Sequence, residues 1–180
     1  MNAVEVELPA WAIASPTRRA HIARVTELAL SWADAMRVDR EERDAWRDAA
    51  RWHDALRDAS ESELRAIVPN LAWPASLLHG PAAAARLAED GEQRTSVLDA
   101  IYWHTIGNAT WDRTGRVLYM ADYLEAARQF DREERARLAA RVAIDFDGTY
   151  RDVVKHRLAA RVASGEKLRA ETIALWESVQ

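Results

Sequence analysis

The stretch PTRRAHIARVTELALSWADAM, from Pro16 to Met36, decides the fold class of this 180-residue chain. Five inward positions recur at spacings of four, three, four and three residues: His21, Val25, Leu28, Trp32 and Ala35. This period is typical of an amphipathic α-helix with one buried face. A proline such as Pro16 suits the first turn of a helix. The stretch therefore predicts a helix over residues 16–36 that carries a histidine on its inward face.

The same helical pattern continues along the rest of the chain. Further helices are expected over about 40–57, from 60 to just before 69, over 80–89, 93–104 and 113–128, and two or three times more after 131. Ser60 with Glu63, and Asp131 with Glu134, have the spacing of capping boxes. Six glycines and five prolines are few for a sandwich or barrel, and β-branched runs are too short to build a sheet. The predicted architecture is all-α.

Composition and charge bound the class of protein. We expect one domain over residues 17–180, preceded by an N-terminal extension over 1–16. The absence of cysteine excludes disulfides, a cysteine nucleophile and thiolate metal sites. A net charge of −4 argues against a nucleic-acid partner. Residues 1–15 lack the basic start of a signal peptide, and prolines interrupt the longest uncharged stretch. We therefore expect a cytoplasmic protein with no membrane partner.

Ionisable side chains fall on the inward faces of several predicted helices. His21, His53 and His104 lie on the apolar faces of three different ones. Asp54 follows His53 directly, and Asp122 lies within the hydrophobic run VLYMADYL. Buried ionisable groups are costly unless they are paired or bind a metal ion. Imidazole with carboxylate suits iron, manganese, cobalt or zinc. The pattern indicates a metal site, and hydrogen-bonded core residues are the alternative.

These residues also match a known family. The ordered set His21, His53-Asp54 and Asp122 resembles the H…HD…D signature of the HD-domain metal-dependent phosphohydrolases, and His79 and His104 match the extra histidines of its dinuclear branch. Four longer words resemble the bacterial symmetrical bis(5′-nucleosyl)-tetraphosphatases over residues 17–176: HIARV from 21, HGP from 79, HTIG from 104 and ADYLEAAR from 121. The chain departs from that family at Ile106, where a second threonine is common, and at Ala126-Ala127, where Pro-Gly is common.

The resemblance implies a single HD-domain helical bundle with two divalent metal ions. The first ion would be held by His21, His53, Asp54 and Asp122, and Asp54 would bridge to a second ion that is completed by His79 and His104. The implied metal is iron, with manganese, cobalt and zinc as alternatives. The implied reaction cleaves diadenosine tetraphosphate symmetrically to two ADP.

Elementary chemistry agrees with that reaction. Two divalent ions and two aspartates give the centre a net charge of about +2, because histidine binds a metal as the neutral ring. A positive centre of this kind suits a polyphosphate. A hydroxide bridging two metal ions can form near neutral pH and attack phosphorus. No side-chain nucleophile is needed, so the reaction is compatible with a chain that lacks cysteine.

Several residues near the signature are candidates for contact with the substrate. Arg24 follows His21 by three residues, Arg57 follows Asp54 by three, and Arg128 ends the Asp122 helix. An arginine can clamp a phosphate through two hydrogen bonds. We expect Arg57 to act with Asp54 in catalysis, and Arg24 and Arg128 to bind the substrate, although solvated surface arginines are the simpler interpretation. Thr105 and Gly107 could meet phosphate in the loop after His104, or could simply end a helix.

Two other interpretations of the function remain open at this stage. An HD-fold di-iron oxygenase would use nearly the same ligands on a small organic substrate, and a non-catalytic HD module would bind nucleotides, the ligand class expected here. A homodimer is compatible with either. The words around Asp145 and Asp147 mimic a haloacid-dehalogenase loop, but the residues that follow have a helical pattern. His156 is expected on a solvated face, and Trp103 and Trp111 are the tryptophans placed to line a pocket.

Overall fold

The computed structural model describes residues 7–180, and within this range it contains helices and no strand. The elements are α1 (Pro16–Met36), α2 (Arg40–Trp52), α3 (Glu61–Ile67), the 3-10 helix η1 (Ala75–Leu77), α4 (His79–Glu89), α5 (Thr95–Trp103), α6 (Arg113–Leu124), α7 (Arg132–Arg141), α8 (Phe146–Ala163) and α9 (Ala170–Ser178). The all-α prediction is confirmed. None of the helices in the described range is long and apolar enough to cross a membrane.

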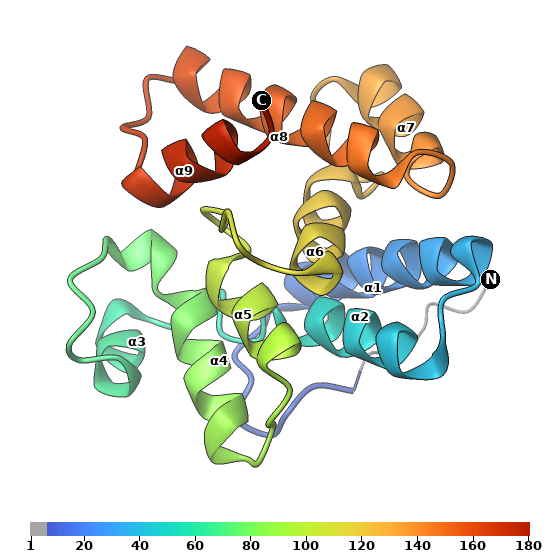
Figure 1. Ribbon diagram of the computed structural model, residues 1–180. Coiled ribbons are helices and arrows are strands. Elements are labelled where there is room, and N and C mark those ends of the chain that lie inside the picture. The colour runs from blue at the N-terminus through green and yellow to red at the C-terminus, as the bar shows by residue number, and fades with distance from the viewer. Residues whose placement is uncertain (1–6) are drawn as a thin grey trace.

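Helix α6 is the centre of the architecture. It contacts α1, α2, α5, α7 and α8, whereas α3 and α4 lie on one side of the molecule and α7, α8 and α9 on the other (Figure 1). Every residue from Val117 to Leu124 is buried, because this helix has neighbours all around it. Its hydrophobic sequence therefore reflects its position, and Asp122 is a carboxylate in the middle of the protein.

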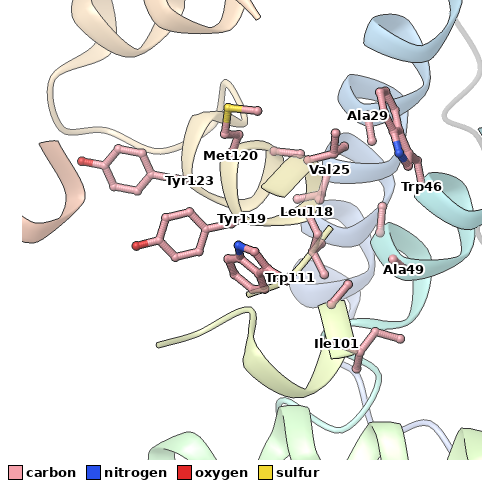
Figure 2. Close-up of a cluster of buried hydrophobic side chains, with 14 of the residues drawn as sticks. Val25, Ala29, Trp46, Ala49, Ile101, Trp111, Leu118, Tyr119, Met120 and Tyr123 are labelled. Atoms are coloured by element: carbon pink, nitrogen blue, oxygen red, sulfur yellow. The ribbon is translucent and has the colours of Figure 1, made fainter. Parts of the chain in front are cut away.

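The core packs around this helix. Val25 and Ala29 of α1, Trp46 and Ala49 of α2, and Ile101 of α5 meet the inner face of α6 (Figure 2). All five are at most 1% exposed. Alanines at the contacts allow helix axes to approach closely, since the distance between packed helices follows the size of the side chains between them. Close packing brings the polar residues of α1, α2 and α6 together at one end of the core.

Two helices are shorter than the sequence predicts. Helix α2 ends at Trp52 instead of residue 57, and a turn over residues 53–58 follows. In that turn, the amide of Ile13 donates to the carbonyl of Ala55 at 2.8 Å. Helix α6 ends at Leu124 instead of residue 128. Both predictions were wrong because backbone groups at these ends bond to segments far away in sequence, which helical periodicity does not report.

One predicted capping box is present and the other is not. The Ser60 hydroxyl accepts from the amide of Glu63, and the Glu63 carboxylate accepts from the amide of Ser60. Asp131 makes no such cap: its φ is 42°, and its carboxylate lies 3.6 Å from Nε2 of His156. A left-handed residue does not direct its side chain to the first turn as an N-cap requires. The capping prediction at Asp131 was therefore wrong.

The segment before α1 is attached to the helical domain. The Trp11 indole donates to Asp90 at 2.6 Å, and the amide of Ser15 donates to Asp58 at 2.8 Å. The Ser15 hydroxyl caps α1 by accepting from the amide of Arg18. The expected extension over 1–16 therefore lies, in its described part, along the turn after α2. Residues 1–6 are outside the described range.

Candidate metal centre

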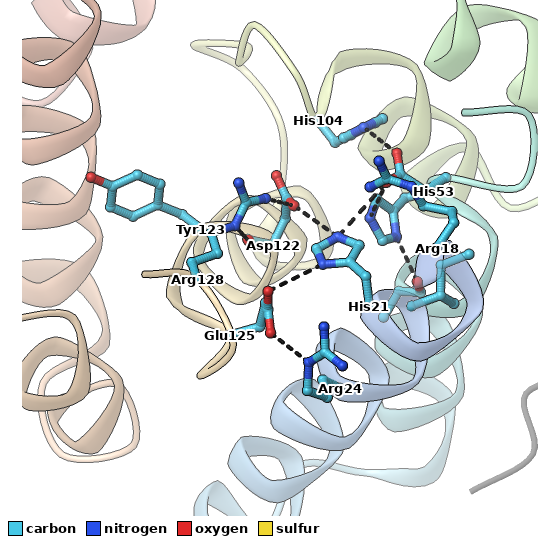
Figure 3. Close-up of polar contacts among 12 residues, drawn as sticks. Arg18, His21, Arg24, His53, His104, Asp122, Tyr123, Glu125 and Arg128 are labelled. Carbon is cyan, nitrogen blue, oxygen red and sulfur yellow. Dashed lines mark hydrogen bonds and ion pairs between the residues drawn. The ribbon is translucent and has the colours of Figure 1, made fainter. Parts of the chain in front are cut away.

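Four histidines and two aspartates from five parts of the chain converge at α6, and Figure 3 shows His21, His53, His104 and Asp122 among them. His21 is on α1, His53 and Asp54 follow α2, His79 begins α4, His104 follows α5, and Asp122 is on α6. None of the six is more than 7% exposed. The sequence predictions therefore identified residues that the fold brings together. They also placed His53 inside a helix, whereas it stands directly after one.

The backbone fixes how His53 and His104 face the centre. Nδ1 of His53 lies 2.7 Å from the carbonyl of Ala50, and Nδ1 of His104 lies 2.7 Å from the carbonyl of Ile101. A carbonyl only accepts, so each Nδ1 is the protonated nitrogen. In the neutral ring, Nε2 then carries a free lone pair, which is the form that binds a metal ion. The last turns of α2 and α5 therefore prepare two histidines in the same way.

The two oxygens of Asp54 face different groups of histidines. Its Oδ2 lies 3.6 Å from Nε2 of His53 and 3.7 Å from Nε2 of His21. Its Oδ1 lies 3.3 Å from Nε2 of His79 and 3.5 Å from Nε2 of His104. A carboxylate with one oxygen toward each of two nitrogen clusters has the arrangement of a bridging ligand.

The donor set fits metal ions. Ligand atoms of His21, His53 and Asp122 lie within 4.8 Å of one another, as do those of His53, Asp54 and His104. Nε2 of His79 and Nε2 of His104 are 3.1 Å apart, and two atoms each about 2.1 Å from one ion at a right angle are about 3 Å apart. Nε2 of His53 is buried with no hydrogen-bond partner, a costly state that a metal bond relieves. The residues can hold a metal ion.

Burial and neighbouring charges set the protonation of this centre. Burial lowers the pKa of His53 to about 4, so its ring is neutral. Burial acts in the same direction on His21, but the hydrogen bonds that its ring donates to the carboxylates of Asp122 and Glu125 outweigh it and raise the pKa of His21 to about 9. Burial opposes ionisation of Asp54, yet His53, His104 and His79 hold its pKa well below the usual range. Both aspartates are therefore anions, and without a metal ion the proton on His21 supplies part of the balancing charge.

Three further charged residues touch these ligands and were missed in the sequence. Glu125, 3% exposed, places Oε1 3.4 Å from Nδ1 of His21. The guanidinium of Arg18 lies 2.6 Å from Oδ2 of Asp54, and that of Arg157 lies 3.4 Å from Oδ2 of Asp122. Arg18 precedes His21 by one turn, which was a usable signal. Arg157 reaches the site from α8, and no local pattern reports such a contact.

The predicted substrate contacts divide into two groups. Arg128 and Thr105 lie at the centre: Arg128 bonds Oδ1 of Asp122 at 2.6 Å, and the Thr105 hydroxyl lies 3.2 Å from Nε2 of His104. Arg24 instead bonds the far side of Glu125 at 2.7 Å, away from the imidazole Nε2 atoms. Arg57 is half-buried in the turn after Asp54. Gly107 has a φ of 86° and its amide donates to the carbonyl of Trp103, so it ends α5 as a helix C-cap does.

Three aromatic or histidine predictions need correction or refinement. His156 is not simply solvated, because its Nδ1 lies 2.6 Å from the hydroxyl of Tyr123. Trp111 does not line a pocket at the centre: it is 5% exposed and donates to the hydroxyl of Tyr150. Trp103 packs against Trp73 at a ring distance of 5.5 Å. The tryptophan contacts are packing contacts, as large aromatic rings usually make.

Gly80 permits the close approach that places His104. A Cβ at this position would lie 2.7 Å from the carbonyl oxygen of Ile101 and 3.2 Å from Cε1 of His104. We expect Gly80→Ala to lower the free energy of unfolding by about 1–3 kcal/mol, because α4 and α5 must separate. The shift should also lower metal occupancy, measured by elemental analysis beside urea unfolding. Unchanged stability and metal content would contradict this role.

An all-α bundle with a buried centre of histidines and aspartates defines a class of protein: helical proteins that bind metal ions. The HD domain family model matches residues 18–127, which include all six converging residues, and the chain belongs to this family.

Two curated relatives and one solved structure extend the comparison. The chain is similar to the symmetrical bis(5′-nucleosyl)-tetraphosphatase of Halalkalibacterium halodurans, with 25% identity over 90% of this chain and 88% of the relative. It is 30% identical to the enzyme of the same name from Bacillus subtilis over 68% of this chain and 69% of the relative. A predicted HD superfamily hydrolase involved in NAD metabolism from Clostridium acetobutylicum shares the fold, with a TM-score of 0.76, 23% identity and coverage of 92% and 89%. The family match and the two curated relatives place the chain among the HD-domain hydrolases, and the solved structure shows the shared fold.

Proposed function

We propose that this protein is a phosphohydrolase with a dinuclear metal centre that cleaves diadenosine tetraphosphate symmetrically to two ADP. The observation that carries the proposal is Asp54, whose two oxygens face His21 and His53 on one side and His79 and His104 on the other. The names of the two curated relatives support the choice of substrate. The donor set of nitrogen and oxygen also suits iron, manganese, cobalt and zinc.

The side chains of this protein prepare the centre for that chemistry. Metal ions held by the six ligands would supply an ionised water and positive charge for the phosphate oxygens. Arg18 fixes the orientation of Asp54 through its bond to Oδ2. Glu125 fixes the ring of His21 through Nδ1. Such contacts behind a ligand hold its orientation and tune its basicity.

Arg128 and Thr105 are the substrate contacts that best fit the geometry. Arg128 is bonded to the carboxylate of Asp122 through one terminal nitrogen and to its carbonyl through Nε, and the N–H groups of the other terminal nitrogen can donate to a phosphate. The Thr105 hydroxyl lies beside both His79 and His104, where it can donate to a phosphate oxygen. Arg24 bonds Glu125 and Gly107 bonds the carbonyl of Trp103, so neither contacts the imidazole cluster. The charge of Arg57 is near enough to help lower the pKa of His79, which is compatible with its proposed role beside Asp54.

Product analysis tests the proposed function directly. Protein purified without oxygen and supplied with Fe(II), Mn(II) or Co(II) should convert diadenosine tetraphosphate to ADP as the single nucleotide product, measured by ion-exchange chromatography. ATP with AMP would show asymmetric cleavage and overturn the symmetric scheme. Consumption of oxygen with a small organic substrate, and no release of phosphate compounds, would identify an oxygenase instead.

The second metal position can be removed selectively. His79→Ala and His104→Ala each delete a nitrogen that faces Oδ1 of Asp54, while the His21, His53 and Asp122 group stays complete. We expect each variant to keep one metal ion per chain, remain folded and lose at least about 100-fold in turnover, since a direct ligand matters more than the groups behind it. Elemental analysis and circular dichroism measure the first two effects. Two metal ions in either variant would contradict the assignment.

A further inference from the structure

A pocket lined by arginines adjoins the centre on its α8 side. Its volume is about 250 Å³, and its charged lining consists of Arg128, Arg157, Arg161 and one acidic residue, Glu166, beside Tyr123 and Phe130. We call this cavity the arginine pocket, after its three arginines. Arg157 and Arg161 belong to α8, which lies outside the part of the chain matched by the HD domain family model. The pocket is therefore assembled from two separate parts of the chain.

The arginine pocket has more positive than negative charge. Arg157 is 9% exposed and its NH2 lies 3.4 Å from Oδ2 of Asp122, the same carboxylate that Arg128 bonds through Oδ1. The ion-pair partner of Arg161 is Glu166, at 3.9 Å from Nε. Burial and the charge of Arg157 lower the pKa of Arg161, and the distance to Glu166 is long for an ion pair.

A metal ion at Asp122 would increase this imbalance. Arg128 and Arg157 share one carboxylate, and a cation bound to that carboxylate weakens its hold on both. Buried charges without a partner are unfavourable. An anion in the pocket restores the balance, and a guanidinium binds phosphate particularly well because its N–H groups match the oxygens.

Thr105 connects the arginine pocket to the second histidine group. Its carbonyl accepts hydrogen bonds from Arg157 and Arg161, and its hydroxyl lies 3.4 Å from Nε2 of His79 and 3.2 Å from Nε2 of His104. Thr105 thus lies between Arg161 and two of the proposed metal ligands, whereas Arg128 and Arg157 contact the ligand Asp122 directly. A linear phosphate chain can lie with one phosphate at the centre and a neighbouring one in the pocket.

We propose that Arg157 and Arg161, together with Arg128, bind a phosphate of the substrate beyond the one that is attacked. This inference rests on the proposed function and narrows its substrate class to nucleotides whose chain has at least two linked phosphates. Helix α8 is then the element that selects substrates by the number of their linked phosphates. A phosphoester with a single phosphate would make no contact with the arginines of α8.

Binding of inorganic tripolyphosphate tests the arginine pocket without any turnover. Metal-free protein should bind tripolyphosphate in calorimetry, because the carboxylate partner of Arg161 is 3.9 Å away even when no metal ion draws on Asp122. Arg161→Met should weaken this binding at least about 10-fold, as expected for loss of one hydrogen bond between charged groups. Arg151→Met, at an exposed arginine of the same helix, should leave binding within about twofold, as for most surface changes. Equal binding by wild type and Arg161→Met would overturn the proposal.

A second measurement serves if Arg161→Met does not fold. Wild-type protein is treated with phenylglyoxal, which modifies arginines, with and without tripolyphosphate. Mass spectrometry should show that tripolyphosphate protects Arg157 and Arg161 and does not protect Arg151. Equal modification of Arg161 in both samples would contradict the subsite.

Kinetics separate failure of this inference from failure of the proposed function. With diadenosine tetraphosphate, Arg161→Met should raise KM at least about 10-fold. Cleavage by wild type with no change of KM in the variant would reject the subsite and keep the function. Protection of Arg161 by tripolyphosphate with no cleavage of any dinucleoside polyphosphate would reject the function and keep the subsite.

Discussion

Asp54→Asn is expected to abolish hydrolysis and to reduce the metal content from two ions per chain to one or none. The change preserves the size of the side chain and removes the negative charge that both groups of histidines face. Groups behind a ligand typically contribute 10–100-fold to metal affinity or activity, so loss of a bridging ligand should exceed about 100-fold. Turnover of diadenosine tetraphosphate and elemental analysis measure the two effects.

Asp58→Asn is the matched control for this variant. Asp58 lies in the same turn, four residues after Asp54, and also faces Arg18, at 3.9 Å. Its oxygen accepts from the amide of Ser15, a bond that asparagine can also make. Turnover should stay within about twofold of wild type, as for most surface changes. Full turnover and two metal ions in Asp54→Asn would reject the bridging arrangement.

Arg135→Met is expected to cause the largest loss of stability. Arg135 is 2% exposed, and its guanidinium donates to the carbonyls of Tyr123, Glu125, Arg128 and Phe130. It therefore provides hydrogen-bond donors for the backbone carbonyls at the end of α6 and in the loop that follows. Glu125 and Arg128 extend from this loop to the centre. Each bond to a charged donor contributes about 1.5–3 kcal/mol, and removal of a buried cation offsets part of that. We expect the free energy of unfolding to fall by about 3 kcal/mol, measured by urea unfolding.

Arg137→Met tests whether any arginine of α7 would have this effect. Arg137 lies two residues away and is exposed, with a surface ion pair to Glu134 at 2.6 Å. Pairs of this kind contribute about 0–1 kcal/mol, so the loss should be small. If both variants lose the same free energy of unfolding, the hydrogen bonds of Arg135 are not what stabilises the loop after α6.

Local sequence was a good guide where a residue acts through its own helix. The stripe that contains His21 predicted the extent of α1, since helical period and proline are local features, although Ala35 of that stripe is exposed. It was a poor guide at the ends of α2 and α6. There Ile13 bonds the turn after α2 and Arg135 bonds the end of α6, so the helix stops because of contacts with distant segments. The capping prediction at Asp131, whose backbone is left-handed, failed in the same way.

The sequence by itself determined that the protein is all-α and that inward-facing histidines and aspartates accompany its helices, because periodicity and residue type are readable from neighbours along the chain. Only the tertiary structure decided that Asp54 presents one oxygen to each histidine group. It also decided that Glu125, Arg18 and Arg157 stand behind the ligands and that α8 adds arginines to the site. Such contacts depend on how helices far apart in sequence pack around α6, and no local pattern encodes that packing.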